Sequence, residues 1–255
     1  MVLDKERVRA RFGRSLAGYD DEAAVQRGMA RRLVAQIVRH GGVDHGSVFE
    51  IGCGTGLLTR ELAGSLRIAR FAANDLVPEC GPRVARELSR LPATALSFHP
   101  GDIETIDLPA APFDLVASNA VFHWLDDLER QLDRLADLLR GGGLLAFTTF
   151  GPDNLREVVA VGRAGLRYRS LEDVAALVGH RFVIRHHEEY REVLRFPSPR
   201  RVLEHLRRTG ANGLERAGWT RATLRAFDSA YRERFGSGDD VTLTYHPLLF
   251  IAKKR

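Results

Sequence analysis

Val48-Phe49-Glu50-Ile51-Gly52-Cys53-Gly54-Thr55-Gly56-Leu57-Leu58 is the stretch of this chain that decides its fold. A short run of β-prone apolar residues surrounds an acid, three alternating glycines follow, and Leu57, Leu58 and Leu62 then recur at helical spacing. The pattern predicts a strand, a tight turn and a helix. Because glycine has no Cβ, the turn can bend sharply and let a ligand approach its backbone. We therefore expect a nucleotide-like cofactor above this loop.

The spacing of the glycines distinguishes between cofactors. A dinucleotide-binding loop follows Gly-x-Gly-x-x-Gly, in which the third glycine lets the helix pack closely below a pyrophosphate. Leu57 occupies that third position here. Glu50, just before the loop, would repel a phosphate but could accept hydrogen bonds from an ammonium group. The Glu-x-Gly-x-Gly-x-Gly loop resembles motif I of the class I S-adenosylmethionine-dependent methyltransferases, which implies S-adenosylmethionine as the cofactor.

The composition is that of an ordinary globular protein, with 255 residues, 44% hydrophobic residues and a formal charge of +5. The length suits one α/β domain with an elaboration. No apolar run has signal-peptide or membrane-spanning length, so we expect a cytoplasmic protein without a membrane partner. Cys53 and Cys80 lack Cys-x-x-Cys spacing, and no metal site is predicted. The excess positive charge is compatible with an acidic partner but does not identify one.

Strand-like and helix-like segments alternate through the first 150 residues, which predicts an α/β fold with a mostly parallel sheet and helices on both faces. Asp75 follows the second strand, nineteen residues after Gly56, where nucleotide-binding α/β folds hydrogen-bond ribose hydroxyls. Helix capping is the alternative role for this acid. Asp102 and Ile103 follow the third strand, where they could hold an adenine ring. The expected elements are 21–40, 67–73, 95–98, 113–120, 125–139 and 144–150.

The chain divides into four predicted parts. Residues 1–40 form an N-terminal flap and helix, and 41–196 form the cofactor-binding core, which ends in a strand at 190–196. Residues 197–240 form a helical insertion that could act as a lid over the substrate. Residues 241–255 return as the final strand of the core sheet, in which Pro247 implies a bulge or an edge position.

A capped helix is expected between the core and the insertion. Ser170 is at the N-cap position of a segment at 170–178, and Asp173 occupies the capping-box position three residues later. Pro197-Ser198-Pro199 opens a second helix, and a third is expected at 220–235.

Longer segments resemble the malonyl-acyl-carrier-protein O-methyltransferase family of biotin synthesis over nearly the whole chain. They are Phe12-Gly13-Arg14 through Tyr19-Asp20, Gly101 to Glu104, Ser118 to Trp124, Ala146 to Asp153, Arg207 to Gly213 and Leu243 to His246. Glu50 replaces the more usual Asp, and the segment from Val77 to Cys80 diverges from the commoner form. The resemblance implies a Rossmann-like class I fold with a seven-stranded sheet and a helical insertion before the last strand. It also implies methylation of the free carboxylate of a malonyl thioester, on acyl carrier protein or coenzyme A.

The resemblance assigns roles to individual residues. The implied cofactor-binding residues are Glu50, Gly52, Gly54, Gly56, Asp75, Leu76, Asp102, Ile103 and Asn119. Tyr19 would close over the sulfonium, and His123 and Trp124 would face the methyl acceptor. Tyr245 and His246 would line the same pocket. Ordinary core packing is the alternative for these aromatic residues. No general base is required, because a carboxylate is already ionised at neutral pH.

Arginine would suit the malonyl carboxylate, and Arg14 and Arg195 are the candidates. Arg200, Arg201, Arg207 and Arg208 crowd one predicted helix of the insertion and could steer an acidic carrier protein toward it. A solvated basic face is the alternative interpretation.

Three other functions share parts of this pattern. One is a methyltransferase for another small acid such as trans-aconitate, and a second is a non-catalytic protein that binds S-adenosylmethionine. A nucleic-acid methyltransferase would fit the charge, but base-amine enzymes of this fold usually carry Asn/Asp-Pro-Pro-aromatic where this chain has Ser118-Asn119-Ala120-Val121. We therefore expect no nucleic-acid partner.

Overall fold

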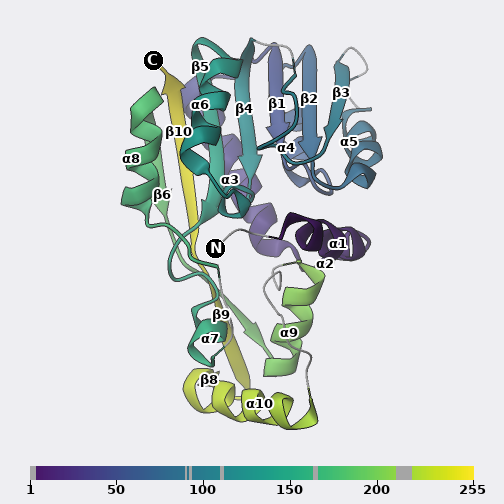
Figure 1. Cartoon of the computed structure of the whole chain (residues 1–255), viewed down its shortest axis with the longest axis vertical. Coiled ribbons are helices and arrows are strands. Elements are labelled where there is room, and N and C mark those ends of the chain that lie inside the picture. The colour runs from purple at the N-terminus through teal and green to yellow at the C-terminus, as the bar shows by residue number, and fades with distance from the viewer. Residues whose placement is uncertain (1–3, 90, 92–93, 110–111, 163–165, 211–219) are drawn as a thin grey trace.

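The computed structural model describes residues 4–89, 91, 94–109, 112–162, 166–210 and 220–255. Part of the predicted insertion 197–240, including the end of the Arg207 to Gly213 segment, lies outside these ranges. The larger part of the molecule is a seven-stranded sheet with the order β3-β2-β1-β4-β5-β10-β6 (Figure 1). Its strands are β1 Ser47–Ile51, β2 Arg70–Asp75, β3 Ala95–Pro100, β4 Phe113–Asn119, β5 Leu139–Phe150, β6 Phe182–Glu189 and β10 Pro247–Lys254.

The sheet is mostly parallel, as predicted. β1 pairs in parallel with both β2 and β4, whereas β10 runs antiparallel to its two neighbours, β5 and β6. Because the carboxyl ends of parallel strands meet at one edge, the loops after β1, β2 and β4 gather there.

Helices cover both faces of this sheet, since consecutive strand residues point to opposite sides. Val48 packs in one apolar cluster and Phe49 in another on the opposite face. The first cluster includes residues of α3 Ala24–Gly41, α4 Leu57–Ser65 and α5 Gly81–Leu88, and the second those of α6 Leu128–Leu138 and α8 Leu171–Arg181. The predicted fold class is therefore confirmed.

A smaller antiparallel sheet, β7-β9-β8, lies beyond the carboxyl edge of the large sheet (Figure 1). Its strands are β7 Glu192–Phe196, β8 Gly236–Ser237 and β9 Asp240–Tyr245, and it is accompanied by α7 Arg156–Ala160, α9 Pro199–Arg208 and α10 Arg221–Phe235. Val202, Tyr231 and Leu243 belong to its apolar core. The N-terminal helices α1 Lys5–Ser15 and α2 Tyr19–Glu22 lie between the large sheet and α9 in Figure 1. The short 3-10 helices are η1 Pro78–Cys80 and η2 Phe122–Trp124.

The predicted capping box at the start of α8 is present. The Ser170 hydroxyl accepts a hydrogen bond from the Asp173 amide at 3.1 Å, and the Asp173 carboxylate accepts one from the Ser170 amide at 3.3 Å. Thr220 forms a second capping box with Thr223 at the start of α10, whereas Ser198 caps α9 only by accepting a hydrogen bond from the Arg201 amide. None of the helices in the described ranges is both long enough and apolar enough to span a bilayer.

The predicted strand at 241–252 is two strands. β9 ends at Tyr245 in the small sheet and β10 begins at Pro247 in the large one. The prediction of a bulge or an edge position for Pro247 was therefore wrong, because β10 lies between β5 and β6. Proline is tolerated at the first residue of a strand, where its missing N–H breaks no ladder.

The sequence interpretation also missed β6. In this edge strand, exposed residues alternate with less exposed ones, and the less exposed positions continue from Phe182 and Ile184 into the polar residues His186 and Glu188, which interrupt the apolar pattern. The strand expected at 190–196 is β7, which belongs to the small sheet.

Candidate functional site

The glycine loop connects β1 to α4 with a backbone that few other residues could adopt. Gly52 and Gly54 have φ angles of +64° and +53°, in the left-handed region that favours glycine. A Cβ on Gly52 would lie 2.3 Å from Val121 Cγ2, and one on Gly54 would lie 3.3 Å from the Phe12 ring. Glycine at these two positions therefore lets Val121 and Phe12 pack directly against the loop backbone. Gly56, with φ +88°, is the N-cap of α4.

One cavity lies at the carboxyl edge of β1, β2 and β4, with α1 and α2 contributing to its wall. Residues from both ends of the sequence therefore line the same space. The predicted site residues in its lining are Tyr19, Glu50, Gly52, Gly54, Asp75, Leu76, Asp102, Ile103, Asn119, His123, Trp124 and Tyr245.

Glu50 is a carboxyl group buried at the base of this cavity. Its side chain accepts a hydrogen bond from the Thr59 hydroxyl at 2.6 Å. Burial raises the pKa of Glu50 to about 8, because removal from water disfavours the charged form. An ammonium group beside it would restore the ionised carboxylate.

Asp75 is held by the backbone on both of its oxygens. The Gly54 amide donates to Oδ2 and the Val77 amide donates to Oδ1, each at 2.8 Å. Burial raises the pKa of Asp75, while these amide hydrogen bonds favour its ionised form. The Leu76 amide and the Cys80 thiol also hydrogen-bond this carboxylate. A ribose hydroxyl would therefore share an oxygen that already accepts from the protein.

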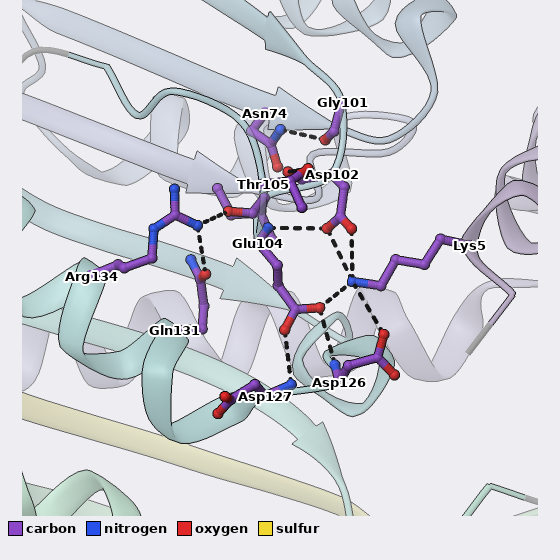
Figure 2. Close-up of polar contacts among 11 residues, drawn as sticks. Lys5, Asn74, Gly101, Asp102, Glu104, Thr105, Asp126, Asp127, Gln131 and Arg134 are labelled. Atoms are coloured by element: carbon purple, nitrogen blue, oxygen red, sulfur yellow. Dashed lines mark hydrogen bonds and ion pairs between the residues drawn. The ribbon is translucent and has the colours of Figure 1, made fainter. Parts of the chain in front are cut away.

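Asp102 takes part in a charged cluster that joins α1 to the loops after β3 and β4 (Figure 2). Lys5 Nζ lies 3.0 Å from Asp102 Oδ1 and 2.9 Å from Oδ2, and it also contacts Glu104. Glu104 in turn accepts hydrogen bonds from the amides of Asp126 and Asp127 at 3.0 and 2.8 Å. Burial lowers the pKa of Lys5, but the hydrogen bonds to Glu104 and Asp102 outweigh it and raise the pKa. Lys5 thus ties α1 to the cavity.

Aromatic side chains form another part of the lining. The His123 ring lies 5.0 Å from the rings of Trp124 and Phe150, and the Phe150 ring lies 5.8 Å from that of Tyr245. Burial lowers the pKa of His123 to about 3, so its imidazole is neutral, and Nδ1 has no hydrogen-bond partner in the described structure. Tyr19 packs edge-on against Phe12, with the ring centroids 5.2 Å apart. A polar or cationic group could enter this part of the cavity without displacing an existing hydrogen bond to His123.

Comparison with known proteins identifies the family to which this chain belongs. Residues 49–147 match the family model described as a methyltransferase domain. Malonyl-[acyl-carrier protein] O-methyltransferase of Chlorobium luteolum is 40% identical over 255 residues, covering 100% of this chain and 97% of that protein. The Porphyromonas gingivalis protein of the same name is 39% identical, covering 98% and 96% of the two chains. The chain belongs to this methyltransferase family. It is therefore an enzyme, and S-adenosylmethionine is its cofactor.

Solved structures agree on the fold. N-methyltransferase NodS from Bradyrhizobium japonicum WM9, in complex with S-adenosyl-L-homocysteine, aligns with a TM-score of 0.60 at 18% identity, covering 97% of this chain and 98% of that one.

The hydrogen-bonding groups that line the cavity match those of the predicted cofactor. Glu50, Asp75 and Asp102 supply three carboxylates along one edge of the sheet, where the ammonium, the ribose and the adenine amino group each need an acceptor. Glu50 has no cation among its described hydrogen-bond partners, and Gly52 and Gly54 of the loop line the cavity beside it. Asn119 is oriented by its neighbours, since its side chain accepts from the Thr148 hydroxyl at 2.7 Å and donates to the Gln26 carbonyl at 3.0 Å.

Several predicted residues do not line the cavity. Arg14 is exposed, and Arg195 donates to the Ser237 hydroxyl at 2.8 Å on the small sheet. His246 is buried between the two sheets, where it lies 2.9 Å from Glu189 and accepts from the Asp153 amide at 3.1 Å. The others outside the lining are Gly56, Arg200, Arg201, Arg207 and Arg208.

The arginines of α9 differ from one another. Arg201 bonds to Glu204 at 2.5 Å and to Glu22 at 3.3 Å, and Arg208 also contacts Glu22 at 3.3 Å. Arg200 and Arg207 are exposed.

Sequence reasoning missed other residues of the lining. They include Lys5, Arg9, Phe12, Thr55, Asn74, Phe150, Asn154, Tyr168 and Thr209. The many basic residues of the N-terminal segment that contains Lys5 could have suggested a partner for Asp102 and Glu104. Tyr168 has no motif around it that would have revealed its position.

Proposed function

We propose that this enzyme transfers a methyl group from S-adenosylmethionine to the free carboxylate of a malonyl thioester carried by acyl carrier protein, in biotin synthesis. The observation that carries the proposal is end-to-end similarity, near 40% identity, to proteins named for this activity. The cavity supports it with a complete set of cofactor acceptors next to an aromatic wall.

In this proposal the loops at the sheet edge hold the cofactor. Glu50 binds the methionine ammonium, Asp75 binds the ribose hydroxyls, and Asp102 accepts from the adenine amino group. Ile103 and Leu76 cover apolar parts of the nucleoside, and Asn119 contacts the methionine end. Tyr19, on α2, lies over the sulfonium, where an aromatic ring beside a cation contributes about 0.5–2 kcal/mol.

The acceptor part of the cavity needs no general base. Bound S-adenosylmethionine supplies an electrophilic methyl group, which passes to a carboxylate oxygen while the carbon–sulfur bond breaks and its electron pair remains on sulfur. His123 is neutral, so it can donate one hydrogen bond to the acceptor without neutralising its charge. Trp124 and Phe150 exclude water from the carboxylate, which leaves it more reactive.

The malonyl carboxylate is received mainly by neutral donors in this account. Arg14 and Arg195 do not line the cavity, and Lys5 is already paired with Asp102 and Glu104. Arg9 does line the cavity, but its side chain is about half exposed and lies 4.0 Å from Glu6. Hydroxyl and imidazole groups of Tyr19 and His123 are available in the lining instead.

The carrier protein would dock on α9. Arg200 and Arg207 are exposed on this helix, whereas Arg201 and Arg208 are occupied by Glu22. Exposed positive charge steers an acidic partner during association.

The substrate is tested by incubating the protein with methyl-labelled S-adenosylmethionine and four acceptors in parallel. These are malonyl-acyl carrier protein, malonyl-coenzyme A, free malonate and trans-aconitate. We expect the fastest transfer to the malonyl carrier protein. Transfer to trans-aconitate with none to either malonyl thioester would overturn the proposal.

A further inference from the structure

A buried chain of hydrogen bonds joins three segments beside the cavity. His205 of α9 lies between Glu22 of α2 and Tyr245 of β9. Its Nδ1 is 2.9 Å from Glu22 Oε2, and its Nε2 is 2.8 Å from the Tyr245 hydroxyl. Tyr245 lines the cavity, whereas His205 is buried behind it with 2% of its surface exposed.

The partners of this chain fix the direction of each proton. Burial acts to raise the pKa of Glu22, but hydrogen bonds from His205 and Arg201 outweigh it and hold the pKa below its usual value. Glu22 is therefore an ionised acceptor, so His205 Nδ1 carries the proton that it receives. Burial lowers the pKa of His205, so the ring is neutral and Nε2 has only a lone pair. The Tyr245 hydroxyl must therefore donate to Nε2.

We propose that Glu22 and His205 orient the Tyr245 hydroxyl so that its oxygen lone pairs, rather than its proton, face the cavity, and that His205 is thereby a positioning residue for methyl transfer. This inference rests on the proposed function. The Thr209 side chain also hydrogen-bonds the Tyr245 hydroxyl. A lone pair of the Tyr245 oxygen that remains free attracts the positive sulfonium and its methyl hydrogens, and it repels a carboxylate that approaches from the wrong side. Tyr245 thus directs the methyl group toward the acceptor, while Tyr19 and His123 are left to donate to the carboxylate.

Other charged groups near His205 do not change this assignment. Arg201 and Arg208 contact the other oxygen of Glu22, at 3.3 Å each, and so help to keep this carboxylate ionised. From β7, the Phe196 ring packs against the imidazole with centroids 5.0 Å apart. Protonation of His205 would put a second N–H on Nε2 and reverse the hydrogen bond to Tyr245.

A double-mutant cycle tests the proposal through kcat at saturating substrates. We expect His205→Phe and Tyr245→Phe each to lower kcat roughly tenfold, and the double variant to lower it by roughly the same factor. His205→Gln, which can still accept from Tyr245, should recover part of the loss. If His205→Phe lowers kcat as much in the Tyr245→Phe background as in the wild type, His205 does not act through the hydroxyl and the proposal fails. If His205→Phe does not fold, Glu22→Gln replaces it in the same cycle.

The pH dependence of kcat gives a readout that a purely structural role would not move. The pKa of His205 is lowered, so the wild-type kcat should fall only at pH values more acidic than those at which an ordinary histidine titrates, as His205 becomes protonated. This acid limb of the pH profile should be absent from His205→Gln. His40→Gln, at an exposed histidine, is the matched control and should keep the limb. An identical acid limb in wild type and His205→Gln would contradict the proposal.

The proton positions can also be measured without turnover. Nitrogen-15 NMR of the protein with bound S-adenosylhomocysteine should show His205 as the neutral tautomer with its proton on Nδ1, assigned by its loss in His205→Gln. A proton on Nε2 would refute the proposed orientation even if the enzyme methylates a malonyl thioester. If the expected tautomer is found but no malonyl thioester is methylated, the proposed hydrogen-bond chain stands and the proposed substrate is rejected.

Discussion

The role of Glu50 predicts that cofactor binding depends on pH. Without cofactor its pKa is about 8, so about one carboxyl in a hundred is ionised at pH 6 and about one in four at pH 7.5. An ammonium group beside Glu50 stabilises the ionised form, so binding releases a proton at the lower pH. The affinity for S-adenosylhomocysteine should therefore rise about 20-fold from pH 6 to pH 7.5. Burial raises the pKa of Asp75 as well, which contributes in the same direction.

Isothermal titration calorimetry at these two pH values, in buffers with different ionisation enthalpies, measures both the affinity and the proton release. We expect release of about one proton at pH 6. Glu50→Gln should bind more weakly at pH 7.5 and lose most of the pH dependence, whereas Glu79→Gln, at an exposed acid of η1, should retain it. A wild-type affinity that is constant between pH 6 and 7.5, with no proton release, would refute the assignment of Glu50 to the ammonium.

Three further predictions concern other parts of the molecule. Lys5→Met should speed S-adenosylhomocysteine dissociation roughly fivefold in stopped-flow measurements, because α1 loses its ion pairs with Asp102 and Glu104. An unchanged dissociation rate would show that α1 does not retain the cofactor. Ser170→Ala should lower the free energy of unfolding by about 1 kcal/mol in urea titrations, because the capping box is lost, and it should leave cofactor affinity unchanged. A variant as stable as the wild type would contradict this prediction. Reversing Arg200 and Arg207 to Glu should raise KM for the carrier protein roughly tenfold more than KM for malonyl-coenzyme A, and equal increases would argue against docking on α9.

The cofactor half of the site was predictable because its signals are local. The glycine loop and Asp75 are defined by spacing within about thirty residues, and each follows a strand whose apolar pattern is strong. These residues line the cavity where the sheet topology brings their loops together.

The other contacts of the site join residues that are distant in the sequence, and no local pattern reveals such pairs. Lys5 meets Asp102 across 97 positions, and His205 meets Glu22 across 183. The division between β9 and β10 was missed because strand-forming residues run from Val241 to Ala252. Only the structure shows that pairing in the small sheet ends at Tyr245 and that pairing in the large sheet begins at Pro247, with the buried His246 between them. α9 was predicted as a basic helix, but only the structure shows which of its arginines are occupied by Glu22.

Mass spectrometry of the carrier-bound product tests the central claim most directly. Malonyl-acyl carrier protein and acetyl-acyl carrier protein, which lacks the free carboxylate, are each incubated with the enzyme and S-adenosylmethionine. The account predicts that the malonyl thioester gains one methyl group, which mild base removes as expected for an ester, and that the acetyl thioester gains none. Equal methylation of both carriers, or no methylation of the malonyl thioester by an enzyme that binds the cofactor, would contradict it.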